Sequence, residues 1–151
     1  MTGRPRDPFG RPLPRDSAAP VEADPDPLPP EETLRTAAAL LREGRAFRAH
    51  EAFEACWKAT AGQERQLWRA LAQLAVGITH AQRGNARGSA ALLRRGADNL
   101  LAWEGARPHG VPISALRAWA TDGAVAPLPA EKLMAAMPPL VAAADEADSG
   151  G

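Results

Sequence analysis

A chain of 151 residues has room for one domain with a single modest core. Its formal net charge is zero, so no overall field draws it to nucleic acid or to a membrane surface. Tyrosine is absent and β-branched residues are scarce, whereas alanine, leucine and arginine, all strong helix formers, are abundant. The composition therefore favours an all-α fold. The excess of arginine over lysine indicates a GC-rich bacterial genome rather than a function.

Targeting signals and disulfides are not indicated. No apolar run approaches the roughly 18 residues that a membrane-spanning helix needs. The N-terminus carries arginines but lacks the apolar core of a secretory signal peptide. Cys56 is the only cysteine, which excludes an intrachain disulfide. We therefore expect a cytoplasmic protein with no membrane partner.

Prolines recur throughout residues 1–29, among charged and small residues. Such a segment buries too little apolar surface to offset the entropy lost on ordering. The sequence therefore predicts a disordered, proline-rich arm over residues 1–29.

Helical spacing of apolar residues begins near Pro30 and continues to Gly44, a plausible stop. A second helix is predicted over about 45–60. A third follows over about 63–83, with an apolar row that starts at Leu67. The short connections between these helices favour antiparallel neighbours in a bundle.

The second half of the chain continues the helical pattern. Asn85, directly after Gly84, reads as the N-cap of a fourth helix over about 86–104. A loop, a short helix over 114–120 and a last helix over 130–144 follow, and residues 145–151 form a polar, frayed tail. The sequence thus predicts one helical domain over residues 30–144, a single compact bundle of five to six helices.

Polar side chains interrupt the second and third predicted helices, beside their apolar faces. They are His50, Glu51 and Glu54 on one helix, and Arg69, Gln73 and His80 on the other. Antiparallel packing would gather them in one groove between the helices. Such groups are costly to bury unless they pair or do chemistry, so this His/Glu polar cluster is the best clue to function.

The same residues carry a family resemblance. Three sequence segments follow one another: His50-Glu51-x-x-Glu54-x-x-Trp57, residues 71–76, and the run from His80 through Gly84-Asn85 to Ser89. Over roughly residues 33–104 the chain resembles the bacterial "domain of unknown function 309" family. The resemblance implies a small all-α domain and no established reaction.

Three hypotheses compete for the cluster. It is a structural network that fixes helix register, a divalent metal site with ligands His50, Glu54 and His80, or a metal-free acid–base site in which Glu51 or Glu54 tunes a histidine.

The leading function is a binding or interaction module, with a buried cluster and either a protein partner or a second copy. The alternative is a metal-dependent, hydrolase-like enzyme with Glu51 as the base.

A weaker candidate is an anion patch at the start of the fourth helix. Arg83, Asn85 and Arg87 surround a helix N-terminus, where phosphate and other anions bind readily. No aromatic residues interleave with these arginines, which argues against nucleic acid as the partner.

Overall fold

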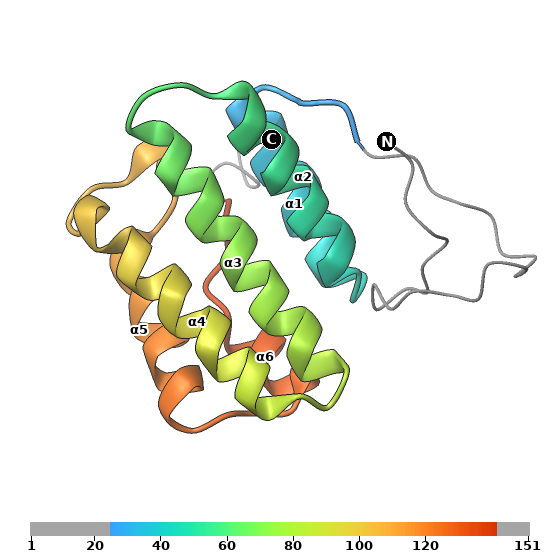
Figure 1. The fold of residues 1–151 in the computed structure, drawn as a ribbon. Coiled ribbons are helices and arrows are strands. Elements are labelled where there is room, and N and C mark those ends of the chain that lie inside the picture. The colour runs from blue at the N-terminus through green and yellow to red at the C-terminus, as the bar shows by residue number, and fades with distance from the viewer. Residues whose placement is uncertain (1–24, 142–151) are drawn as a thin grey trace, which may run out of the picture.

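The computed structural model describes residues 25–141 (Figure 1). This part of the chain contains two 3-10 turns and no β-strand, and its α-helices confirm the predicted all-α bundle. The helices are α1 (Pro30–Arg42), α2 (Ala46–Ala59), α3 (Glu64–Gln82), α4 (Ala86–Leu100), α5 (Ile113–Val125) and α6 (Ala130–Ala136). The 3-10 turns are Leu101–Trp103 and Pro108–Gly110.

From α1 to α5, helices that follow one another in the chain pack side by side. In Figure 1, α3 runs through the centre of the bundle, between α2 and α4. The outer helix α1 packs on α2, α5 packs on α4, and α6 contacts α3. The central position of α3 agrees with its many buried side chains, among them Trp68, which stacks on Phe53 of α2 at 6.4 Å between ring centroids.

The turns between helices follow the predicted glycine and asparagine signals. Gly84 ends α3 in the left-handed region with φ +75°, which suits a residue without Cβ. Asn85 then caps α4, since its Oδ1 accepts a hydrogen bond from the Gly88 N–H at 2.9 Å. The N-cap prediction for Asn85 is confirmed.

Two glycines allow α3 and α4 to approach closely. A Cβ on Gly77 would lie 2.9 Å from Leu93 Cγ, and a Cβ on Gly96 would lie 2.5 Å from Leu74 Cδ2. Each glycine therefore accepts a leucine of the facing helix. This contact sets the position of α4 residues relative to α3.

The two C-terminal helices differ from the predicted ranges. The prediction of 114–120 for α5 was too short, because the helix runs from Ile113 to Val125 and its last turn is packed: Gly123 is buried against Leu93 and Leu133. The prediction of 130–144 for α6 was too long. Pro138 holds Met137 in an extended conformation with ψ 129°, so the helix ends at Ala136.

Some predictions fall outside the described residues. These are the disordered arm as far as residue 24, the last residues of the predicted final helix, and the frayed tail over 145–151. Residues 25–29 lie ahead of α1 and are not helical. None of the described helices combines the length and the apolar character needed to cross a membrane.

Candidate functional site

A pocket lies between the antiparallel helices α2 and α3, and we call it the α2–α3 pocket. Its volume is about 260 Å³, and its walls are His50, Glu54, Trp57, Arg69, Ala72, Gln73 and Val76. Each successive turn of both helices contributes a side chain, which is the result of the i, i+4 and i+7 spacing. Four of the six residues predicted for the polar cluster meet here: His50, Glu54, Arg69 and Gln73.

Glu54 is the most connected side chain of the pocket. Its two carboxylate oxygens contact different partners, with His50 Nε2 at 3.0 Å from Oε2 and Lys58 Nζ at 3.2 Å from Oε1. The His50 side chain is 18% exposed and that of Glu54 is 41% exposed, so the cluster is half-buried rather than buried. The expectation of a fully buried cluster was wrong.

Burial lowers the pKa of His50 below its ordinary value of 6.5, and the nearby carboxylates of Glu54 and Glu51 only partly oppose this effect. The imidazole is therefore neutral at neutral pH. In that state Nε2 carries the proton and donates to Glu54, while Nδ1 is buried without a hydrogen-bond partner in residues 25–141.

Gln73 is held by a residue that the sequence analysis did not single out. Asn99 of α4 donates from Nδ2 to Gln73 Oε1 at 2.7 Å. Gln73, whose oxygen is engaged in this way, is also one of the residues that line the pocket. The two residues are far apart in the chain, and no local pattern links them.

Trp57 forms a rigid wall of the pocket. The Arg65 guanidinium lies 4.2 Å from the centroid of the indole ring, and Arg65 Nε donates to the Trp57 carbonyl oxygen at 3.2 Å. Trp57 Nε1 is buried, and within the described chain it has no acceptor. Leaving a buried donor without an acceptor costs about 1–3 kcal/mol.

Arg69 differs from the other charged side chains of the pocket in having no partner among the described residues. Its side chain is exposed and lines the pocket. No hydrogen bond or ion pair connects it to any residue between 25 and 141. Lys58 offsets the charge of Glu54, which leaves Arg69 as the uncompensated charge of the pocket.

Glu51 lies apart from the α2–α3 pocket. Arg48 donates to its Oε1 at 2.8 Å. Together with Glu54 it lines a second hollow of about 340 Å³ that also includes Pro25 and Pro27. The predicted base therefore faces this second hollow, which it shares with Glu54 but not with His50.

His80 does not join the cluster. Its Nδ1 is 3.2 Å from Asn85 Nδ2, so it supports the cap of α4. Burial and the charge of Arg83 lower its pKa. Among residues 25–141, no group of three histidine, cysteine or acidic side chains is placed to hold a metal ion. The predicted ligand set of His50, Glu54 and His80 is therefore not assembled.

The predicted anion patch is partly occupied by the protein itself. The Asn85 side chain already accepts the Gly88 amide at the N-terminus of α4, and Asn85 and Arg87 are both exposed. Anion binding at Arg83, Asn85 and Arg87 stays a prediction.

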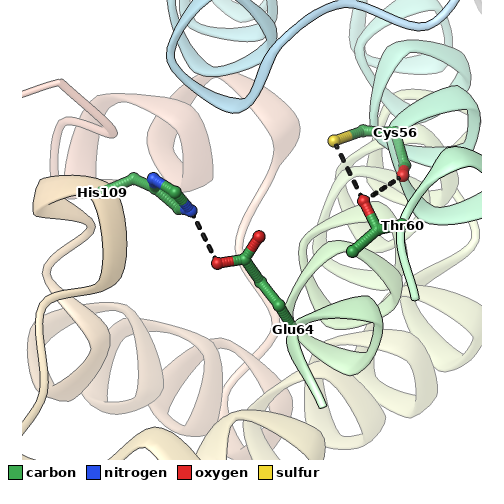
Figure 2. Close-up of polar contacts among 4 residues, drawn as sticks. All are labelled: Cys56, Thr60, Glu64 and His109. Atoms are coloured by element: carbon green, nitrogen blue, oxygen red, sulfur yellow. Dashed lines mark hydrogen bonds and ion pairs between the residues drawn. The ribbon is translucent and has the colours of Figure 1, made fainter. Parts of the chain in front are cut away.

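A second polar contact was missed entirely (Figure 2). His109, which the sequence analysis left without a role, pairs through Nε2 with Glu64 Oε1 at 2.7 Å and lies against Trp68, with ring centroids 5.8 Å apart. It has a φ of 53°, and it joins the 3-10 turn before α5 to the start of α3. Nearby, Thr60 donates to the Cys56 carbonyl oxygen at 2.7 Å.

Fold and site together define a small all-α domain with a polar pocket between two antiparallel helices. The family profile described as Domain of unknown function (DUF309) matches residues 34–92, which include every residue of the α2–α3 pocket. Over that range the chain is similar to this family, in agreement with the resemblance seen in the sequence. No curated protein and no solved structure matches the chain.

Proposed function

We propose that this protein is a ligand-binding module whose recognition site is the α2–α3 pocket. The observation that carries the proposal is a set of polar groups that the fold leaves unsatisfied at one place. Arg69 has no partner in residues 25–141, and Trp57 Nε1 and His50 Nδ1 are buried without one. Native proteins pair nearly all buried polar atoms, so two orphaned atoms in the walls of one pocket, beside an unpaired exposed arginine, support a role in binding.

The shape of the pocket supports the same proposal. Apolar walls from Ala72, Val76 and the Trp57 ring alternate with a few polar groups, which is the usual composition of small-molecule sites. Arg65 fixes the indole from outside the pocket, so little side-chain entropy is lost when a ligand packs on it.

The experiment uses the indole N–H signals of the ¹⁵N-labelled full chain. Trp57 lines the pocket, whereas the Trp119 indole donates to the Leu133 carbonyl oxygen at 2.9 Å and serves as the internal control. A library of neutral, cationic and anionic fragments is titrated to millimolar concentration. We expect at least one fragment to shift the Trp57 signal, assigned with Trp57→Phe, and to leave the Trp119 signal in place.

A pocket-filling variant provides the control. Val76→Phe adds bulk inside the pocket and should abolish the shift, whereas Ala91→Phe adds the same ring to an exposed position of α4 and should preserve it. Thermal unfolding checks that both variants are folded. The proposal is overturned if no fragment moves the Trp57 signal, or if the shift persists in Val76→Phe.

A further inference from the structure

We infer that the α2–α3 pocket selects an organic carboxylate with a small apolar body, and that Arg69 and Gln73 hold the carboxylate. The inference rests on the proposed function and adds the chemical class of the ligand. It depends on three features of the pocket: its uncompensated charge, the direction of its hydrogen-bond donors, and its apolar lining.

The uncompensated charge is positive. Glu54 is the only acidic side chain lining the pocket, and both of its oxygens are engaged, one by His50 and the other by the Lys58 ammonium group. Arg69 is engaged by nothing between residues 25 and 141. An anion that enters the pocket therefore meets an unpaired guanidinium and an acidic neighbour that is already compensated.

The hydrogen-bond donors of the pocket also favour an anionic ligand. Asn99 donates to the Gln73 oxygen, so that oxygen is already engaged, and the Gln73 N–H groups are the donors left for a ligand. A guanidinium next to a donating amide matches the two oxygens of a carboxylate, because the planar fork of arginine binds such a group in a bidentate manner.

The lining distinguishes a carboxylate from inorganic phosphate. Among the described residues that line the pocket, Arg69 is the one unpaired cation, whereas a phosphate dianion calls for more positive charge or for several backbone N–H groups. The Trp57 ring, Ala72 and Val76 offer apolar surface that phosphate cannot use. A monoacid with a flat apolar body uses both parts of the pocket.

Benzoate, benzamide and benzylamine test this preference, because they share one ring and differ in charge. Affinities are measured from the shift of the Trp57 indole signal of the full chain, and inorganic phosphate is titrated as a fourth probe. We expect benzoate to bind at least about tenfold more tightly than either analogue. Arg69→Gln should remove this preference, while Arg94→Gln, which deletes the same charge from an exposed position of α4, should retain it.

Asn99→Asp tests the role of Asn99 as a positioning residue. A carboxylate at position 99 accepts from the Gln73 amide, which turns the Gln73 oxygen toward the pocket. Benzoate affinity should fall by about tenfold while benzamide affinity is retained, a change in selectivity that a loss of packing alone would not produce.

The outcomes separate this inference from the proposed function. If benzoate is not preferred, or if Arg69→Gln and Arg94→Gln behave alike, the carboxylate assignment is wrong. If in the same experiments Val76→Phe still abolishes fragment binding, the pocket remains a binding site. Tighter binding of phosphate than of benzoate would also overturn the assignment.

Discussion

Gly96→Ala measures how closely α3 and α4 pack, and two opposing effects set its magnitude. Alanine is favoured over glycine in a helix interior by about 0.8–1.0 kcal/mol. The added Cβ, however, would lie 2.5 Å from Leu74 Cδ2 and 3.2 Å from the Ala70 carbonyl oxygen. Leu74 can rotate, but the backbone oxygen cannot move without α3, and overpacking costs about 1–3 kcal/mol. We expect a net loss of about 1 kcal/mol in the free energy of unfolding.

Urea unfolding followed by circular dichroism measures this change, and Ala91→Gly calibrates the intrinsic term. Ala91 is exposed on the same helix, so its replacement should cost about 1 kcal/mol through helix propensity alone. In a Leu74→Ala background the contact with Leu74 is gone while the contact with the Ala70 oxygen stays, so Gly96→Ala should cost less than in the native background. The reasoning is refuted if Gly96→Ala stabilises the protein by as much as Ala91→Gly destabilises it.

Three further predictions concern the polar residues. Because the pKa values of His50 and His80 are lowered below 6.5, the unfolded chain takes up protons first, and the free energy of unfolding should fall as the pH drops below about 6.5. His50→Gln should flatten this dependence in urea titrations, and an unchanged slope would contradict it. Glu54→Ala should cost less than about 1 kcal/mol, since its pair with Lys58 is largely exposed; a cost of about 3 kcal/mol would instead indicate a stranded buried charge. A chelator should leave the melting temperature unchanged, because the described residues assemble no ligand group; a lower Tm would refute this.

The sequence predicts the helices well wherever periodicity and turn chemistry agree. Asn85 after Gly84 defines both the end of α3 and the start of α4. The failures concern the bounds of the two C-terminal helices. Gly123 lies inside α5 and packs against Leu93 and Leu133, and Pro138 ends a helix whose apolar pattern continues to Leu140, which is buried without being helical.

The sequence predicts which residues share the candidate site where the spacing along one helix decides which side chains meet. Arg69 and Gln73 are one turn apart and reach the same pocket as His50 and Glu54. His80 lies seven residues beyond Gln73, a rise of roughly 10 Å along the helix, which places it at the next turn of the chain rather than in the pocket. Sharing a helical stripe was therefore not enough; the distance along the helix axis also decides which residues meet.

The residues that determine what the pocket can bind were the hardest to predict, because they act through others. The four predicted pocket residues alone suggest a balanced pair of charges, Glu54 against Arg69. Lys58 and Asn99 change that interpretation: Lys58 takes up the charge of Glu54, and Asn99 turns the amide of Gln73. Lys58 was within reach of sequence reasoning, since it lies one turn after Glu54 on α2. Asn99 was not, because its contact with Gln73 depends on the close approach of α3 and α4 at Gly77 and Gly96. The selectivity that we propose for the pocket would thus depend on the packing of α4, a helix that is not among the walls of the pocket.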